Sequence, residues 1–307
     1  MSALANLLVA GSAVGLRYAL VVLGFVVIYR ATGVINFAQG SFLVLGAYLA
    51  HNAVATWGLN FYLAIPIAMA ICAVLGVLIE LLILRHMVGE PVISVIMVTI
   101  GLFIVLQEVP TAIWSAQELV GDPWGADSKR IGDVIVETRN IATLALAASV
   151  LLVFFLLFRY TKAGIAARAT ALDQEAALAQ GISVRRVVAF SWAIAGAVGA
   201  LAGITAAAGP SPNVTPALGL LALIAFPAMI LGGLDSAGGA VIGGLIIGIT
   251  QSLTTGWAAG TLHFDWLPTY PDVLGKGFDQ VTPYLVMIVI LLIRPFGLFG
   301  TKEVRRL

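Results

Sequence analysis

A charged segment, residues 159–186, separates two long apolar runs. The types and spacing of its residues suit a segment that transmits the movement of a partner protein to the helices on either side. Residues 163–180 are rich in strong helix formers, and Gly181 suits the left-handed backbone that ends a helix. Ser183 can then cap the next helix. The pattern predicts a short amphipathic helix on a membrane surface, which can dock into a groove of a soluble partner. The residues expected to couple this chain to the partner's motion are Arg168, Asp173, Glu175, Ala176, Ala177 and Gly181.

A second group of polar residues interrupts the apolar runs. Broken apolar segments indicate a path for a solute, because backbone groups freed at a break must find water, side chains or solute. The candidates for such a path are Asn36, Phe37, Gln39, Thr99, Asn213 and Gln251. Two alternatives remain open. Asn36 and Gln39 could cap a turn, and Thr99 and Gln251 could hydrogen-bond to neighbouring helices.

Catalytic chemistry is not expected. The three histidines, His51, His86 and His263, all fall near the ends of apolar runs, and Asp235 has no second Asp in a neighbouring run. The sequence contains no Gly-x-x-x-x-Gly-Lys-Ser/Thr motif, so the chain cannot bind ATP in that manner. His, Asp, Glu and Cys do not cluster as metal ligands do, so we expect neither an enzyme nor a bound metal or cofactor.

Composition identifies the environment of these residues. The chain has 307 residues, of which 61% are hydrophobic and 10% charged, whereas soluble domains carry about 25% charged residues. A net charge of +1 gives no sign of nucleic-acid binding. The sequence therefore predicts an all-α polytopic membrane protein that contacts lipid, in a single domain covering residues 1–307.

Apolar runs of about 20 residues mark candidate spans. We expect about eight or nine helices, with some segments re-entrant or broken, over residues 10–30, 38–56, 61–84, 91–110, 140–158, 187–208, 217–234, 237–255 and 281–294. Pairs of glycines four residues apart, such as Gly199 and Gly203, allow helices to approach closely. Glu80 and Arg85 are expected to pair near the end of a span.

The distribution of basic residues sets the orientation, since cytoplasmic loops carry an excess of Lys and Arg. If the coupling loop 159–186 is cytoplasmic, eleven of the sixteen Lys and Arg residues fall on that side and four on the other, with Arg17 inside the first span. The N-terminus is then outside and the C-terminus cytoplasmic. The outer loops are 111–139 and 256–280, whose Trp, acidic and Pro residues fit an interfacial aromatic belt or a docking surface for an extracytoplasmic binding protein.

The segment 168–182, with Glu175-Ala176-Ala177 three residues before Gly181, resembles the EAA loop of ABC importer permeases. It is most similar to branched-chain amino acid permeases of the LivH type. Residues 33–40, Gly-Val-Ile-Asn-Phe-Ala-Gln-Gly, resemble that family's "INFAHG" stretch, with Gln39 where histidine is common.

Three further matches follow in the same order along the chain. Glu80 and Arg85, with Thr99-Ile100-Gly101, resemble the segment around the family's third and fourth helices, although residues 86–90 depart from its "YRPLR" pattern. Residues 231–240 resemble "GGLGSIPGA", and residues 294–300, Arg-Pro-Phe-Gly-Leu-Phe-Gly, resemble "RPQGLFG". Ordered matches over most of the chain make the resemblance specific.

The resemblance implies an ABC importer permease in the bacterial cytoplasmic membrane, with branched-chain amino acids as solutes. It also implies partners: a second, homologous permease, two cytoplasmic ATP-binding subunits that use ATP and magnesium, and an extracytoplasmic solute-binding protein. The departures at Gln39 and 86–90 leave urea or short-chain amides as alternative solutes. From composition alone, an ATP-independent channel or secondary transporter is the alternative class.

Overall fold

The computed structural model describes residues 2–114, 124, 127–131, 134–208, 214–262, 270–271 and 277–300. Six helices within these residues are long and apolar enough to cross a membrane. They are α1 (Ser2–Thr32), α3 (Phe61–Leu82), α4 (Val92–Trp114), α5 (Thr138–Tyr160), α8 (Val184–Ala207) and α11 (Ala237–Ala258). The expectation of an all-helical polytopic membrane protein is confirmed.

The other three apolar runs form shorter or broken helices. α2 (Gln39–Ala55) and α12 (Phe278–Ile293) have 17 and 16 residues. The run predicted over 217–234 is divided into η2 (Pro216–Leu220), α9 (Leu221–Ile224) and α10 (Phe226–Gly232). Pro227 lies in the first turn of α10. A proline there has no N–H to donate to the preceding turn, and this favours the break.

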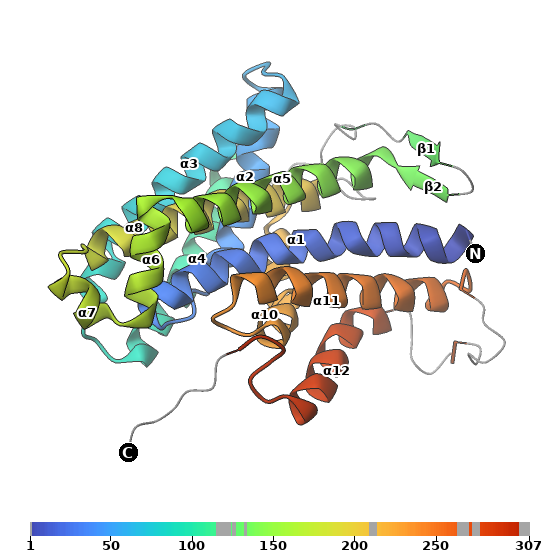
Figure 1. The fold of residues 1–307 in the computed structure, drawn as a ribbon. Helices are drawn as coiled ribbons and strands as arrows, with labels where there is room; N and C mark the ends of the chain where they lie inside the picture. The colour runs from blue at the N-terminus through green and yellow to red at the C-terminus, as the bar shows by residue number, and fades with distance from the viewer. Residues whose placement is uncertain are drawn as a thin grey trace.

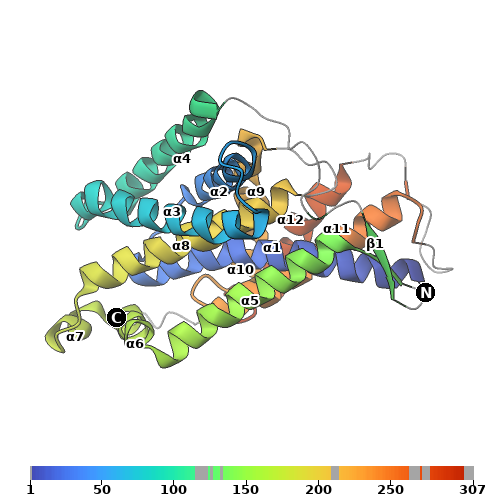
Figure 2. The same ribbon diagram turned by 90° about the horizontal axis from the view of Figure 1, so that it is seen from above.

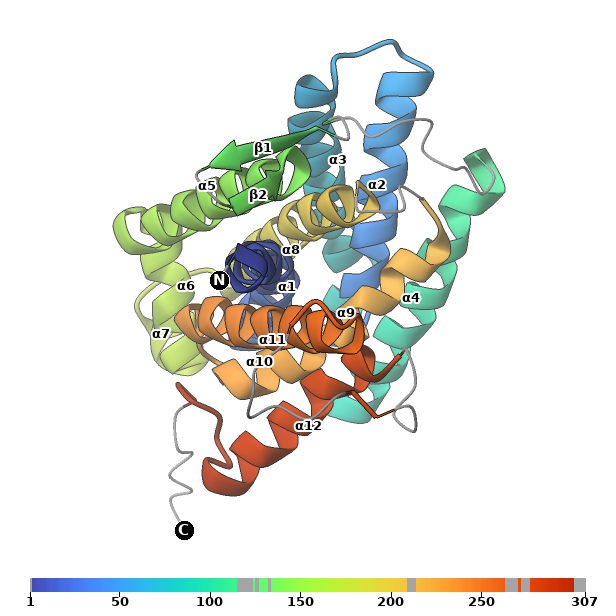
Figure 3. The ribbon, with the colours of Figure 1, turned by 90° about the vertical axis from the view of Figure 1, so that its right-hand side faces the viewer.

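α1 lies at the centre of the bundle, where Figure 3 shows it end-on between α5, α8 and α11. Glycines allow this close packing. A Cβ added to Gly248 of α11 would lie 2.2 Å from the backbone nitrogen of Gly15 in α1, and one added to Gly203 of α8 would lie 1.9 Å from the carbonyl oxygen of Leu43 in α2. The glycine pairs therefore pack helices within this chain.

α4 has the opposite character. It stands at the edge of the bundle (Figure 2). Only 6% of an apolar 18-residue stretch of this helix is buried within the chain. Apolar side chains cover its outer face, including Met97, Ile104 and Val105, each more than half exposed. Such a surface fits contact with lipid or with another membrane helix.

The two ends of the bundle differ (Figure 1). The start of α1 lies beside a hairpin of β1 (Ser128–Ile131) and β2 (Val134–Glu137), where Asn6 Oδ1 accepts a hydrogen bond from the Ile135 N–H at 3.0 Å. This hairpin was not predicted from the sequence. Arg139 donates a hydrogen bond to Glu137 at 2.7 Å, which lowers the pKa of that carboxyl. α6 (Lys162–Leu172) and α7 (Gln174–Ala179) lie at the other end.

Positive charge collects at the end that carries α6 and α7. Seven of the described Lys and Arg residues lie in α6, in the adjoining ends of α1, α5 and α8, or, like Arg85, in a cavity wall to which α7 also contributes. They are Arg30, Arg85, Arg159, Lys162, Arg168, Arg185 and Arg186. Lys129 and Arg130 lie in β1 and Arg139 lies beside β2 in the first turn of α5, while Arg17 lies within α1 and Arg294 directly follows α12.

Candidate functional site

The break between α1 and α2 positions the first candidate residues. Gly33 ends α1 with φ +72°, a backbone conformation that glycine adopts without strain, and its N–H donates to the Tyr29 carbonyl at 2.7 Å. Three residues after Gly33, the Asn36 side-chain oxygen accepts a hydrogen bond from the Ala38 N–H at 3.0 Å. This short turn replaces the helical bonds that α1 would otherwise continue.

Thr99 in the middle of α4 holds the same turn in place. Its hydroxyl accepts a hydrogen bond from the Phe37 N–H at 3.3 Å and donates to the Ile96 carbonyl at 2.9 Å. The Phe37 ring stacks on Phe226 of α10, with centroids 6.0 Å apart and planes 15° apart. Three of the solute-path candidates, Asn36, Phe37 and Thr99, therefore meet where two broken segments and α4 come together.

A cavity of about 720 Å³ begins at this junction and opens at the α7 end of the molecule. Asn36 and Thr99 line it, together with mainly apolar side chains from α1, α4 and α8. Charged residues also contribute to its wall. Arg85 donates to Glu80 at 3.2 Å, and the Glu80 side chain is only 3% exposed. The predicted Glu80–Arg85 pair therefore forms part of the cavity wall.

The other solute-path candidates lie elsewhere. Gln39 is fully buried between α1 and α8, where its amide donates to the Ala195 carbonyl at 3.1 Å. Gln251 of α11 accepts a hydrogen bond from the Tyr18 hydroxyl at 2.6 Å. Gln251 thus connects neighbouring helices, the alternative left open by the sequence. Gln39 also bonds to a neighbouring helix, although the alternative expected for it was the capping of a turn. Neither residue lines the cavity. Asn213 lies outside the described residues.

The predicted coupling loop, residues 159–186, is called the coupling segment below. It forms two helices between α5 and α8, where one was expected from the sequence. Asp173 separates them, because its extended backbone ends α6 and its carboxylate caps α7, accepting from the N–H groups of Glu175 at 2.9 Å and Ala176 at 3.0 Å. Gly181 has φ +80° and closes α7 as expected, its N–H donating to the Leu178 carbonyl at 2.9 Å. Ser183 stands at the N-cap of α8 without a side-chain capping bond to a described residue.

The exposed and buried faces of α7 are distinct. Ala177 is 4% exposed and packs inward, whereas Glu175 and Ala176 face outward. Two large aliphatic side chains are also exposed, Leu172 by 87% and Leu178 by 57%. A patch of Leu side chains beside a carboxylate, on a polar loop, is suited to burial against another protein.

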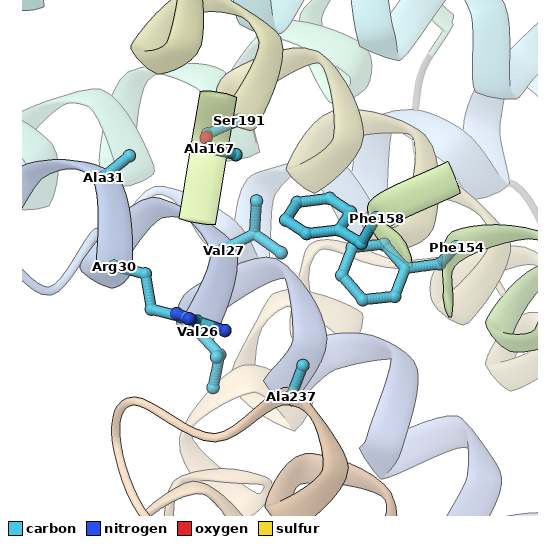
Figure 4. Close-up of a pocket in the computed structure, with 9 residues that line it drawn as sticks. All are labelled: Val26, Val27, Arg30, Ala31, Phe154, Phe158, Ala167, Ser191 and Ala237. Carbon is cyan, nitrogen blue, oxygen red and sulfur yellow. The ribbon is translucent and has the colours of Figure 1, made fainter. Parts of the chain in front are cut away.

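α6 is attached to the end of α5. The Arg168 guanidinium donates to the carbonyl oxygens of Phe158 and Arg159, which α5 leaves without helical partners. α6 also packs near the last turns of α1. Figure 4 shows Ala167 with the rings of Phe154 and Phe158 around Val27. These side chains line a gap of about 10 Å³. α5, α6 and the end of α1 are therefore in close contact.

Gln174 connects α7 directly to the broken end of α1. Its side-chain amide donates to the Ala31 carbonyl at 3.1 Å, across 143 positions of sequence. Gln174 also lines the cavity, as does Leu178. Gln174 was not among the residues predicted from the sequence. Its place beside the capping Asp173 was the available signal, but the identity of its partner is a tertiary property.

A helical bundle with several membrane spans, broken helices and a cavity that opens at one end defines a polytopic membrane permease. Comparison with known proteins gives the family. Residues 7–293 match the family model described as branched-chain amino acid transport system / permease component, and this chain belongs to that family.

Individual relatives cover almost the whole chain. It is 31% identical over 302 residues to a probable branched-chain amino acid transport permease protein LivH of Methanocaldococcus jannaschii, covering 94% of this chain and 90% of the relative. It is 27% identical to the high-affinity permease protein LivH of Escherichia coli K12, covering 96% and 95%, and 27% identical to BraD of Pseudomonas aeruginosa, covering 97% and 96%.

A solved structure shares the fold. A chain of the PsaBC structure from Streptococcus pneumoniae aligns over 96% of this chain and 93% of its own length, with a TM-score of 0.50 and 15% identity. At that identity the similarity concerns the arrangement of helices alone.

Proposed function

We propose that this chain is the permease subunit of an ATP-driven ABC importer in a bacterial cytoplasmic membrane. It admits branched-chain amino acids, while separate subunits hydrolyse ATP with magnesium. Membership of the branched-chain amino acid permease family and the printed descriptions of its relatives support this proposal.

The observation that carries the proposal is the position of α7. This helix and the residue before it present side chains to solvent, and α7 also contributes side chains to the cavity wall. Leu172, Glu175 and Leu178 are exposed for a partner, while Gln174 and Leu178 belong to the cavity wall. An ATPase subunit that moves α7 would therefore change the cavity and the end of α1 together. Packed helices transmit such shifts as rigid bodies.

The remaining surfaces suit the other proposed partners. The exposed apolar face of α4 fits a second, homologous permease. The hairpin end, opposite α7, fits an extracytoplasmic solute-binding protein. There Trp124 packs edge-to-face on Phe61, with centroids 5.3 Å apart, and Trp257 packs on Tyr270 at 4.9 Å.

Coupling can be tested with Glu175→Ala combined with Gly181→Val in the reconstituted complex. Valine at the positive φ of Gly181 strains the end of α7, and loss of Glu175 removes a charge from the patch. We expect the variant to insert in the membrane but to hydrolyse ATP without matching uptake. Unchanged transport would reject the role of α7.

The solute is tested by competition for uptake among Leu, Ile, Val, urea and short amides. We expect the three aliphatic amino acids to compete. If urea or an amide competes and no branched-chain amino acid does, the alternative solute assignment replaces this one.

A further inference from the structure

The cavity wall contains a buried amide that the fold leaves without a partner. Asn36 is 1% exposed, and its oxygen is identified by the hydrogen bond from the Ala38 N–H, since an N–H can only donate. The amide nitrogen therefore carries two donor hydrogens, and it has no partner among the described residues. A buried donor without a partner is unfavourable, so the arrangement favours a ligand that accepts hydrogen bonds.

Arg85 also lines this cavity. Its Nη2 donates to Glu80 at 3.2 Å, whereas its Nε is buried and has no hydrogen-bond partner among the described residues. An amide N–H and a guanidinium N–H together match a carboxylate, which accepts several hydrogen bonds and opposes the positive charge.

The rest of the cavity indicates what else the ligand carries. Glu80 and Glu90 contribute carboxylates that can attract an ammonium group. Arg185 is the other charged residue that lines the cavity, and the remaining walls are mainly aliphatic, with Trp192 as the one aromatic residue among those that line it. The volume of about 720 Å³ lies within the range of roughly 300–1,000 Å³ typical of small-molecule sites. A carboxylate, an ammonium and an aliphatic chain are the parts of an aliphatic amino acid zwitterion.

We propose that this cavity is a cytoplasm-facing site at which an aliphatic amino acid zwitterion rebinds after import and slows further transport. Asn36 and Arg85 bind the carboxylate, Glu80 and Glu90 attract the ammonium, and the valine, isoleucine and leucine side chains hold the aliphatic group. The inhibition follows from the wall itself. Gln174 and Leu178 of α7 line the cavity, so an occupant resists the movement of α7 that empties it. This inference rests on the proposed function and on an orientation of the chain that places α7 on the cytoplasmic side of the membrane.

The test uses the complete complex in proteoliposomes whose lumen contains ATP and either leucine, urea or buffer. The measurement is the initial rate of labelled leucine uptake from outside. We expect lumenal leucine to lower the rate in a concentration-dependent manner and urea to leave it unchanged. Each inhibition curve is normalised to the uninhibited rate of the same complex. The half-inhibitory leucine concentration should be about tenfold higher for Asn36→Ala than for the native complex, because a hydrogen bond to a charged group contributes on this scale.

A matched pair of valine substitutions tests the location. Val95 lines the cavity, whereas Val153 of α5 is 53% exposed outside it. Val95→Trp should abolish inhibition by lumenal leucine, and Val153→Trp should retain it. Uptake that lumenal leucine does not slow, or that both variants leave equally inhibited, would overturn the inference while the proposed function stands.

A direct binding measurement covers the case in which no amino acid is imported. Labelled leucine is equilibrated with the purified complex without ATP and without the binding protein. Saturable binding that Val95→Trp removes and Val153→Trp preserves would support the site even if the proposed function fails. Absence of binding in the native complex, together with no lumenal inhibition, would reject it.

Discussion

At the residue scale, a few side chains connect the broken helices to the coupling segment. Thr99 holds the turn after α1 through the Phe37 N–H, and Asp173 defines the start of α7 through two backbone N–H groups. Gln174 then joins α7 to the Ala31 carbonyl, which lies in the last turn of α1. These contacts give the coupling segment a defined position relative to the cavity.

The prediction at this scale concerns Gln174→Leu, which keeps the size of the side chain and removes its donor. We expect uptake per ATP hydrolysed to fall several-fold, since the lost bond contributes about 0.5–1.5 kcal/mol to holding α7 against α1. Gln180→Leu is the control, because Gln180 stands at the other end of α7 and is exposed. Equal uptake-to-hydrolysis ratios in the two variants would show that the Gln174 bond does not contribute to coupling.

At the element scale, the bundle depends on helices that approach more closely than side chains would allow. α8 meets α2 at Gly203, whereas α4 has open space at Gly101, where an added Cβ would meet nothing within 4 Å. The interior helices therefore require glycine at specific places, and the peripheral helix does not.

Substitution by alanine separates these two cases. Gly203→Ala places its Cβ 1.9 Å from the Leu43 carbonyl oxygen, so the helices must move apart at a cost of about 1–3 kcal/mol. We expect less monodisperse protein in detergent and a lower thermal midpoint. Gly101→Ala should leave both unchanged, and a similar loss in the two variants would contradict the packing argument.

At the scale of the whole molecule, charge and shape define two ends. The α7 end carries most of the described basic residues, and the hairpin end carries the aromatic pairs. Because basic residues are biased toward the cytoplasm, we propose that α7 is inside and the hairpin outside.

This orientation can be measured with single cysteines. The native Cys72 is buried, so the native protein should resist a membrane-impermeant maleimide and serves as the control. In a Cys72→Ala background, Ile135→Cys on β2 should react in intact cells. Leu172→Cys, at a position 87% exposed, should react only after permeabilisation. The reverse labelling pattern would invert the orientation and remove the basis for coupling through α7.

Local patterns were sufficient to predict most of the architecture. Runs of apolar residues marked the helices, Gly181 marked the end of α7, and the spacing of residues 168–182 indicated the coupling segment. Such features depend on neighbours in the sequence, so they can be read from it. The hairpin and the division of the coupling segment at Asp173 were missed, because short strands and caps depend on which groups lie nearby in space.

The sequence by itself determined that this chain is a helical membrane protein with a polar loop between two spans, because hydrophobicity and helix-ending residues act locally, and its motifs resemble those of permeases. Only the tertiary structure decided which polar residues share the cavity. Asn36, Arg85 and Gln174 come together there, while Gln39 and Gln251 bind neighbouring helices. The physical reason is that a buried polar group is satisfied by whatever partner the packed helices bring within hydrogen-bond distance, and its position in the sequence does not specify that partner.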